Sequence, residues 1–259
     1  MLSHRLRQRL SRSVLAACLV LGAAPLCRAQ TLDEVISKYL AARGADAWHH
    51  VQTMQMTAQV DSGGRTTPLT VISKRPNLVR QEVTVNGNTI VEAFDGKMVW
   101  GVNPLVSPEP QQIQGPQAIG LAQQSNFDPV LMVYKQKNVQ VDLVGKSKLG
   151  DRDVYDIRVT QPGGVVQHYF LDATTYLEAR VATEVQRGGQ TLNSTSDPSD
   201  FRNVEGVMMP FQTTQQVSGM PPVVVRVQKV EFNVPVNDSI FRMPTAPVPR
   251  RSLQEGRRP

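Results

Sequence analysis

The stretch AFDGKMVWGVNP (93–104) decides the fold, because it places a turn signal between two apolar runs. Asp-Gly tolerates the positive φ of a two-residue hairpin turn, so we expect Asp95 and Gly96 to join two antiparallel strands. Val91 then lies opposite Trp100, and paired residues share one face of the sheet. One face is uniformly apolar and holds Val91, Ala93, Met98, Trp100 and Val102. On this interpretation Asp95 is a turn residue and not a catalytic acid or base.

Short apolar runs separated by turn signals continue from Thr53 onward. Further turns are marked by Gly63-Gly64, Asn86-Gly87, Gly163-Gly164 and Gly188-Gly189. Many short strands joined by hairpin turns indicate an antiparallel sheet, curled into a sandwich or a partial barrel. At a spacing of about 8–12 residues per strand we expect about eleven strands. The fold class is mainly β (α+β), in one domain over residues 30–244.

The region before Thr53 has a helical pattern instead. Thr31 and Glu34 have the spacing of a capping box, and apolar residues then recur along one stripe of a helix. We expect a helix over residues 31–43 that stops at Gly44, followed by a short helical turn within 45–52.

Residues 103–137 interrupt the strand pattern. They begin NPLVSPEPQQIQGP, which is too rich in proline for a central strand. Two short apolar helices are expected after it, over residues 118–124 and 127–135. A long irregular insertion in a compact β domain is commonly a lid or a binding loop. The other interpretation is a helix that only plugs one end of a barrel.

The two ends of the chain are expected to lie outside the folded domain. Residues 1–29 combine a basic start, a short apolar run and a small residue before the cut site, which predicts a secretory signal peptide cleaved after Ala29. The lipobox-like LAAC at 15–18 offers an alternative, in which Cys18 carries a lipid anchor. Residues 245–259 are rich in proline and arginine, and we expect a disordered basic tail.

The positive charge is concentrated at these ends. The chain has 28 basic and 22 acidic residues. Five arginines lie in residues 1–29, and four arginines with one glutamate lie in 245–259, which leaves 19 basic against 21 acidic residues in the domain. Such a balance argues against a nucleic-acid partner. Both cysteines, Cys18 and Cys27, leave with the signal peptide, so no disulfide is expected.

The domain contains no recognisable catalytic or metal-binding motif. His49 and His50 are adjacent and point apart on a helix, and His168 stands alone. Zinc, calcium, phosphate-loop and nucleophile-elbow patterns are all missing from the sequence. We therefore expect no metal, no cofactor and no enzymatic activity, with a cell-envelope hydrolase as a remote alternative.

Arg75 is the one charged residue whose position is informative. It ends the run LTVISKR (69–75), in which Leu69 and Val71 share its face, and Pro76 ends the strand. The arginine therefore stands at the rim of an apolar face. Its guanidinium either bonds loose backbone carbonyls nearby or extends into solvent across the apolar surface.

Two neighbouring motifs resemble the periplasmic lipoprotein carriers of the LolA type. The motifs are SKRPNLVR (73–80) and FDGKMVWGVNPLV (94–106). The fixed letters of the family pattern fall on Lys74, Arg75, Pro76, Asn77, Leu78, Asp95, Gly96, Lys97, Trp100, Asn103 and Pro104. The ending VEFNVPVNDSIFRMP (230–244) is similar to that of outer-membrane lipoprotein-sorting proteins. The segment GADAW (44–48) and the late strands have no clear counterpart in the family, and the mature chain is longer than the typical carrier.

The resemblance implies a curved, unclosed antiparallel β-barrel with a helical lid over an apolar cavity. Family members carry the acyl chains of lipoproteins from an inner-membrane exporter to an outer-membrane acceptor. The arginine of their K-R-P-N motif bonds backbone carbonyls of the lid and holds the empty cavity closed. Carried over by motif, this lid latch is Arg75.

We therefore expect a monomeric periplasmic carrier or chaperone for the acyl chains of lipoproteins or another lipid. The alternative is a sensor domain of the same fold, which binds mislocalised lipoproteins or a membrane signalling protein. The expected cavity lining is Leu69, Val71, Val91, Met98, Trp100, Val102, Ile119, Phe127, Leu131 and Met132.

Overall fold

The computed structural model describes residues 30–245, except Gly163 and Gly188. The predicted signal peptide, with Cys18, lies outside the described residues. So do residues 246–259 of the predicted tail. The structure therefore bears on the predicted domain alone.

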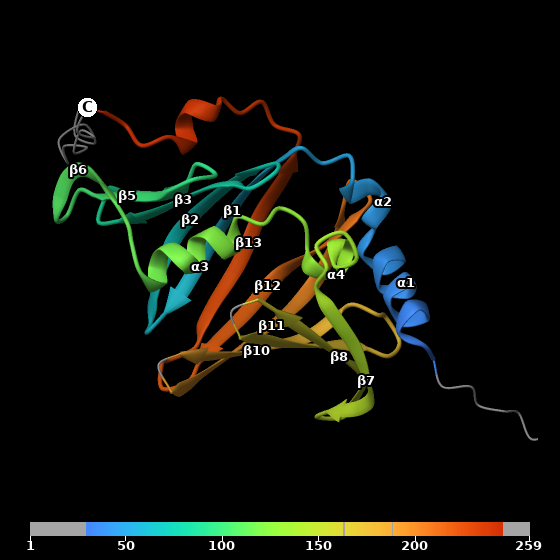
Figure 1. The fold of residues 1–259 in the computed structure, drawn as a ribbon. Helices are drawn as coiled ribbons and strands as arrows, with labels where there is room; N and C mark the ends of the chain where they lie inside the picture. The colour runs from blue at the N-terminus through green and yellow to red at the C-terminus, as the bar shows by residue number, and fades with distance from the viewer. Residues whose placement is uncertain (1–29, 163, 188, 246–259) are drawn as a thin grey trace, which may run out of the picture. The chain divides into compact units, whose positions relative to one another are not determined.

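In the described residues, thirteen strands form one antiparallel sheet (Figure 1). Their bounds are β1 (Thr53–Ser62), β2 (Arg65–Lys74), β3 (Leu78–Val85), β4 (Asn88–Phe94), β5 (Val99–Asn103), β6 (Ser107–Gln112), β7 (Gln140–Leu149), β8 (Arg152–Gln161), β9 (Val165–Asp172), β10 (Glu178–Arg187), β11 (Gln190–Val204), β12 (Val207–Val217) and β13 (Val223–Phe232). The strand order is β6-β5-β4-β3-β2-β1-β13-β12-β11-β10-β9-β8-β7. Two meanders, β1–β6 and β7–β13, are thus joined in the middle by the pairing of β1 with β13.

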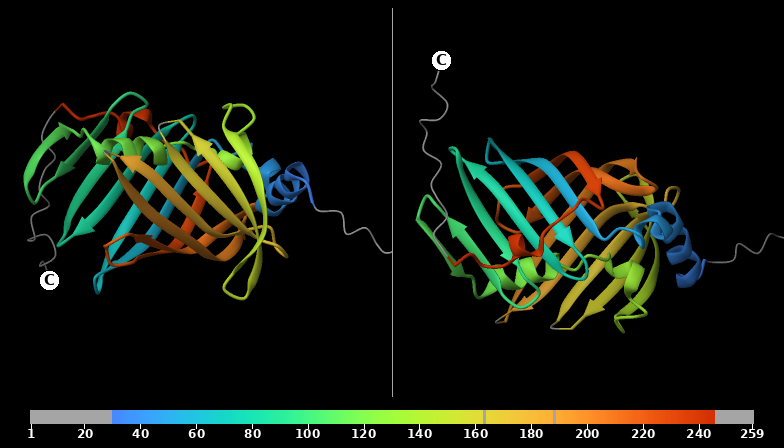
Figure 2. Two further views of the ribbon diagram at one scale, coloured as in Figure 1. Left: turned by 60° about the horizontal axis from the view of Figure 1, so that its bottom comes forward. Right: turned by 90° about the horizontal axis from the view of Figure 1, so that it is seen from above.

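The sheet is a half-barrel that does not close within the described residues. Its edges are β6 and β7, which are consecutive along the chain. Figures 1 and 2 show a strongly curved sheet, with helices α3 (Pro116–Gln124) and α4 (Val130–Val133) on its concave side. We name residues 113–139, which connect the two edges and contain both helices, the lid segment. The expected curved, unclosed antiparallel sheet with a helical lid segment is confirmed.

Two more strands are present than the eleven expected. One of them is β6, which lies in the proline-rich stretch at 103–116, where no central strand was expected. Pro108 and Pro110 cannot donate to a neighbour, and β6 tolerates them because it is an edge strand with β5 on one side only. The stretch is not a central strand, as expected, but its prolines allow an edge strand that was not expected.

The N-terminal helix forms as the sequence predicts. Helix α1 (Leu32–Arg43) starts at a complete capping box between Thr31 and Glu34 and stops at Gly44, which adopts the left-handed conformation with φ 73°. A side chain at Gly44 would collide with the backbone of Gly206, so glycine is required there for two reasons. Helix α2 (Ala45–Trp48) follows directly.

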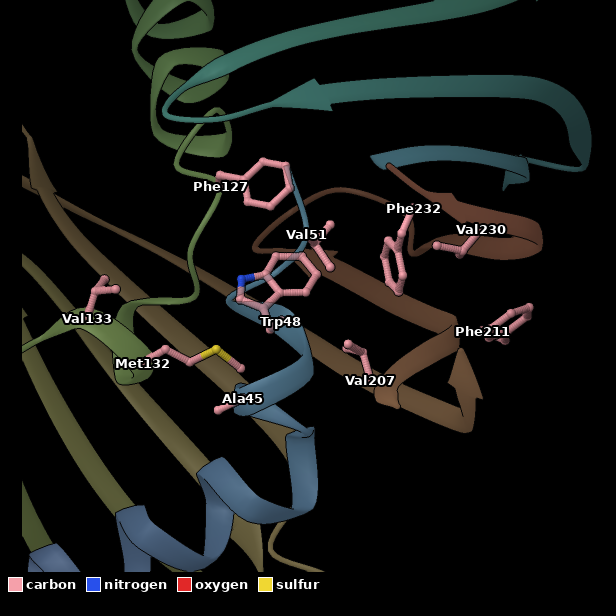
Figure 3. Packing of buried hydrophobic residues seen from close by; sticks show 10 residues of the cluster. All are labelled: Ala45, Trp48, Val51, Phe127, Met132, Val133, Val207, Phe211, Val230 and Phe232. Atoms are coloured by element: carbon pink, nitrogen blue, oxygen red, sulfur yellow. The ribbon is translucent and has the colours of Figure 1, made fainter. Parts of the chain in front are cut away.

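All four α-helices lie on the concave face of the sheet. The α1 residues Val35, Ile36 and Tyr39 pack on β8 together with Leu131 of α4. A second cluster joins α2, the lid segment and strands β12 and β13 (Figure 3), through Ala45, Trp48, Val51, Phe127, Met132, Val133, Val207, Phe211, Val230 and Phe232. Because Leu131 belongs to one cluster and Met132 and Val133 to the other, α4 is an integral part of the core.

Within the described residues, the chain after β13 covers part of the convex face. The 3₁₀-helix η1 (Asp238–Phe241) lies against this face. Beneath it, four side chains form a separate buried cluster, Val91, Ala93, Trp100 and Val102.

The hairpin around Asp95 has a different register from the one expected. Phe94 pairs with Val99 and Ala93 with Trp100, so the loop has four residues, 95–98, and not two. The Asp95 carboxylate accepts hydrogen bonds from the backbone N–H groups of Lys97 and Met98, which favours this wider turn. The error in register is two residues, and side chains alternate with a period of two. The predicted face of Val91, Ala93, Trp100 and Val102 therefore survives the shift.

Candidate functional site: the concave face and its closure

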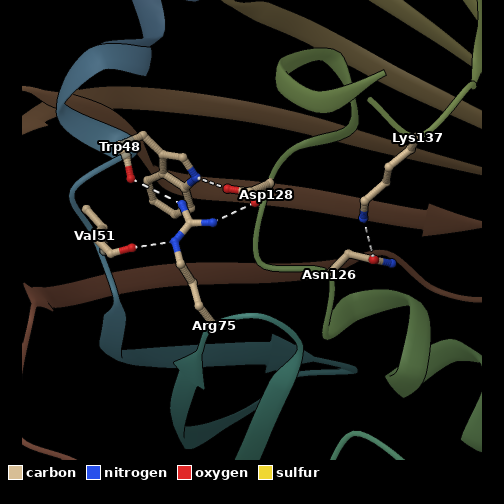
Figure 4. A network of polar contacts seen from close by, with 6 residues as sticks. All are labelled: Trp48, Val51, Arg75, Asn126, Asp128 and Lys137. Carbon is tan, nitrogen blue, oxygen red and sulfur yellow. Dashed lines mark hydrogen bonds and ion pairs between the residues drawn. The ribbon is translucent and has the colours of Figure 1, made fainter. Parts of the chain in front are cut away.

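Arg75 lies at the centre of a polar network at the end of β2 (Figure 4). Its Nε donates to the carbonyl of Val51 at 2.7 Å, and its Nη2 donates to the carbonyl of Trp48 at 3.3 Å. Its Nη1 pairs with Oδ2 of Asp128 in the lid segment at 2.6 Å. The other oxygen of Asp128 accepts a hydrogen bond from the indole N–H of Trp48 at 3.0 Å. Asp128 thus joins the lid segment to both α2 and β2.

Aromatic contacts reinforce this network. The Arg75 guanidinium lies 4.7 Å from the ring centre of Phe127, and the same ring stacks on Trp48 at 5.1 Å. A further hydrogen bond, from Lys137 to Asn126, braces the segment from the other side (Figure 4). Residues 126–128 are therefore held by α2, by β2 and by the chain that follows α4.

The electrostatics favour an ionised Asp128. Partial burial raises the pKa of its carboxyl group, but the hydrogen bond and positive charge of Arg75 and the hydrogen bond from Trp48 outweigh that effect. The net result is a pKa below the ordinary value of aspartate. At neutral pH the network is thus an ion pair, as the geometry suggests.

The network differs in one respect from what the resemblance implies. The carbonyls that Arg75 bonds belong to Trp48 and Val51, which precede β1, whereas the lid segment contributes the Asp128 carboxylate. Neither Trp48 nor Asp128 was singled out from the sequence. The available signal was weak, namely an acid beside an apolar residue in FDP (127–129).

The two lid helices are held very differently. Helix α3 buries Leu121 on Val79 and Val99, with Ala118 and Ala122 packed beside it. Its two ends are held by side-chain hydrogen bonds, Gln117 to Glu92 and Gln124 to Gln81. Those two acceptors are cross-strand partners on β4 and β3. In contrast, three of the four α4 residues are buried, Leu131, Met132 and Val133. Helix α3 is therefore a lightly attached cover, and α4 is fixed.

Part of the concave face is left uncovered by these helices. The strand registers place ten aliphatic residues from nine strands on this face, outside all the buried clusters. They are Val60, Leu69, Val83, Ile90, Val165, Val185, Leu192, Val217, Val223 and Val225. We call this set the open floor. Each of its members is half-buried or exposed, and small polar residues such as Thr213 and Ser196 lie among them.

The open floor lies toward one end of the half-barrel. The turns β1–β2, β3–β4, β5–β6, β8–β9, β10–β11 and β12–β13 are all at that end, which we name the turn end. It is on the left in Figure 1, and α1 and α2 are at the opposite end. A pocket of about 240 Å³ continues the floor beside the start of α3, where Ile90, Val106, Ile113 and Gln117 are among its lining residues.

The predicted cavity residues separate into three groups. Leu69 and Val71 lie on the concave face, and Ile119 is an exposed residue of α3 with 52% of its surface accessible. Phe127, Leu131 and Met132 are buried in the core clusters. Val91, Trp100 and Val102 belong to the buried cluster on the convex face, although Val91 and Val102 also line the pocket of about 240 Å³, and Met98 lies in the hairpin loop. The structure therefore does not bring the ten residues together around one cavity.

Trp100 has a structural partner on the convex side. Its indole N–H donates to the carbonyl of Phe241 at 2.6 Å, and the guanidinium of Arg80, which bonds the carbonyl of Ile240, lies 5.8 Å from its ring centre. The conspicuous tryptophan of the opening stretch thus anchors η1 to the back of the sheet.

A second buried polar group fastens α1. The Tyr39 hydroxyl donates to Glu178 at 2.9 Å, and Arg43 bonds the carbonyl of Met208 and pairs with Glu178 at 3.7 Å. Burial raises the pKa of Tyr39 well above its ordinary value, so the hydroxyl stays a donor. These contacts tie α1 to β10 and β12 and close the end opposite the open floor.

The described residues show neither a metal-binding cluster nor a spanning helix. No group of three or more histidine, cysteine, aspartate or glutamate side chains among them could hold a metal ion. None of the helices in residues 30–245 is long and apolar enough to cross a bilayer.

Solved structures of other proteins share this fold. A LolA superfamily protein of Nitrosomonas europaea has a TM-score of 0.57 and 16% identity, over 83% of this chain and 98% of its own. A DUF1329 family protein of Desulfovibrio piger has a TM-score of 0.57 and 15% identity, over 80% and 97%. A domain described as that of an outer membrane lipoprotein-sorting protein, from Vibrio parahaemolyticus, has a TM-score of 0.54 and 12% identity, over 80% and 94%. No protein-family model matches the chain, and no curated protein sequence is significantly similar to it.

Proposed function

We propose that this protein, whose fold is LolA-like, is a non-enzymatic periplasmic carrier or chaperone for a hydrophobic ligand. The ligand class is the acyl chains of lipoproteins or another lipid, on its way toward the outer membrane. The observation that carries the proposal is the open floor. A concave surface with ten aliphatic side chains that the core does not bury suits the binding of a hydrophobic ligand.

The binding energy of such a ligand comes from buried area. Each CH₂ group transferred from water onto the floor contributes about 0.8 kcal/mol. The floor is built from backbone-paired strands, so it is present before the ligand arrives and little ordering is required. Its small polar residues, Thr213 and Ser196 among them, do not demand a charged partner.

Helix α3 is the part that opens in this proposal. It rests on a single fully buried side chain, Leu121, and on two polar contacts that water can replace. The Arg75–Asp128 network holds the chain just after α3. In this proposal, the opening movement of α3 therefore does not extend beyond residues 126–128. Release of cargo requires that the closed and loaded states differ by only a few kcal/mol, and the contacts of Arg75 favour the closed state.

Neighbouring residues of β13 provide a sharp test of the binding surface. Val225 is on the open floor, and Val224, next to it, is on the convex face. We expect Val225→Asp to abolish binding of a fluorescent fatty acid or of a lipidated peptide in solution, because it places a charge among the acyl chains. Val224→Asp is the matched control and retains binding. Equal binding by the two variants would disprove the location.

Native mass spectrometry of protein taken from the periplasm then tests the functional class. A bound lipid or lipopeptide, absent from Val225→Asp, supports the carrier. A stoichiometric protein partner without lipid indicates the sensor alternative, and turnover of an added ester or amide indicates a hydrolase. Either of the last two results contradicts the proposal.

A further inference from the structure

The turn end carries exposed apolar side chains that the core does not explain. Five of the eight large hydrophobic residues that are most exposed in the described range are in or beside its turns, namely Leu105, Val106, Leu192, Val217 and Met220. Val106 has 81% of its surface accessible and Met220 has 60%. We name these five residues the rim. Exposed apolar side chains gathered at one end of a domain mark an interaction surface.

Hydrogen bonds fix the loops that carry the rim, so the exposure of its side chains follows from the folded structure. The loop after β12 is closed by hydrogen bonds from the Met220 N–H to the carbonyl of Val217 and from the Gln216 side chain to the carbonyl of Met220. The Ser218 N–H donates to the carbonyl of Asn193, next to Leu192 on β11. At the other corner, Asn103 caps the β5–β6 turn by accepting from the Leu105 N–H.

Four of the turns at this end lack charged residues, although Arg65 borders the β1–β2 turn and Arg187 borders the β10–β11 turn. None of the turn residues 62–64, 85–88, 103–107 and 217–222 is acidic or basic. The whole run from Phe211 to Val225 lacks a charged residue as well, in a chain of which 19% is charged. This surface therefore does not suit a protein partner that is recognised through salt bridges. Uncharged polar and apolar side chains together suit the boundary between lipid headgroups and acyl chains.

The geometry points to a lipid bilayer surface as the partner of the rim. Leu105 and Val106 are next to the edge strand β6, whereas Leu192, Val217 and Met220 are on the far side of β1 and β13. Three or fewer side chains at each corner are too few for a standard protein interface of about 800 Å² per partner. A bilayer is a planar apolar phase and can receive both corners at once. The open floor lies between them.

We propose that the protein docks its turn end on a membrane, inserting the rim into the interface. This inference rests on the proposed function and adds to it the route of the ligand. A lipid chain that leaves the bilayer at the rim reaches Val217 and Val223 of the floor without crossing water. Because the inserted residues are apolar, docking depends little on ionic strength.

Flotation of the mature full-length protein with phosphatidylcholine vesicles, at low and high salt, tests this proposal. We expect the wild type to bind at both salt concentrations. Met220→Asp and Val106→Asp should each reduce partitioning by about tenfold, because each puts a charge in place of an exposed apolar side chain that the bilayer would bury. The matched control is Val144→Asp, since Val144 is 58% exposed in the middle of β7, away from the rim.

Several results would overturn membrane docking. They are absence of vesicle binding by the wild type, equal binding by the rim variants, and binding that disappears at high salt. The last would assign the interaction to the arginines after Thr245. Rim variants that lose a protein partner but keep vesicle binding would identify a protein surface instead. Val225→Asp keeps the two proposals separate, because it should lose the ligand in solution and still float with vesicles.

Discussion

At the scale of single residues, Asp128 has the largest consequence for closure. It is the only member of the lid segment, within the described residues, that pairs with Arg75, and it also accepts from Trp48. An arginine bound only to carbonyls would be insensitive to acid. An arginine bound to a carboxylate is not, because the carboxylate can be protonated.

Replacing Asp128 by asparagine removes the ion pair and preserves the shape. We expect Asp128→Asn to lower the free energy of unfolding by about 1.5 kcal/mol at pH 7, the typical contribution of a hydrogen bond to a charged group. The pKa of Asp128 is lowered in the folded state, so its contribution is complete above the unfolded-state pKa of about 3.9 and is lost as the pH falls through the folded value.

Denaturant titrations of both proteins between pH 7 and pH 2 check this. The difference between wild type and Asp128→Asn should stay constant down to about pH 4 and shrink below it. A difference that is constant through the acid range, or that grows, would show that the Asp128 charge does not stabilise the folded state. Asp95→Asn is a suitable control, since Asp95 contacts only backbone N–H groups of its own loop.

Trp100 separates a structural role from a binding role. Trp100→Phe keeps most of the buried ring but removes the hydrogen bond to the Phe241 carbonyl. We expect a loss of about 1–3 kcal/mol in unfolding free energy, because a buried acceptor is left unpaired. Fatty-acid affinity should be unchanged, since Trp100 is on the face opposite the floor. Weaker binding in a variant that remains fully folded would place Trp100 back among the ligand contacts.

At the scale of elements, we expect the two lid helices to differ in how readily their backbone hydrogen bonds open. Helix α4 contributes to two core clusters and α3 to the margin of one. Hydrogen exchange should therefore show fast opening of the α3 amides and slow opening of the α4 amides, as expected for elements with few and many buried contacts. Leu121→Ala should accelerate exchange in α3 alone. Uniform protection across residues 116–133 would mean that the lid segment moves as one body or not at all.

The sequence predicted elements and faces better than it predicted their neighbours. The period of two placed Val91, Ala93, Trp100 and Val102 on one face, and this holds although the register is shifted by two residues. Periodicity cannot say which face is concave. That depends on whether α3 or η1 covers it, and both are distant in the chain. The expectation that Trp100 lines a cavity combined its apolar face with the cavity that the family resemblance implies, and packing beneath η1 accounts for the same apolar face.

The closure network shows the same limit. The motif around Arg75 indicated a residue that bonds other parts of the chain, and the structure shows such bonds. Asp128 is distant in sequence and belongs to no periodic element. Only the folded path of the lid segment brings it to Arg75. Hydrogen-bond partners of this kind depend on the tertiary structure, so pattern and spacing cannot identify them.

At the scale of the whole molecule, the half-barrel has a closed end and an open end. Tyr39, Arg43 and Glu178 close one end, and the floor and the uncharged rim occupy the other. In the proposed carrier function, this polarity would give a ligand a single direction of entry. The distribution of charge follows the same polarity. Charged residues occur over most of the domain, but the run from Phe211 to Val225, which leads into the turn end, has none.

The pairing of β1 with β13 also governs how the chain can fold. Every other strand contact joins sequence neighbours, which can meet as soon as both are made, whereas Met54 has to wait for Phe232. Closing so long a loop is slow. Until β1 pairs with β13, each of these strands is an exposed and unpaired edge of its meander. The nascent chain therefore leaves β1 and β13 without their mutual pairing until the last of the thirteen described strands is made.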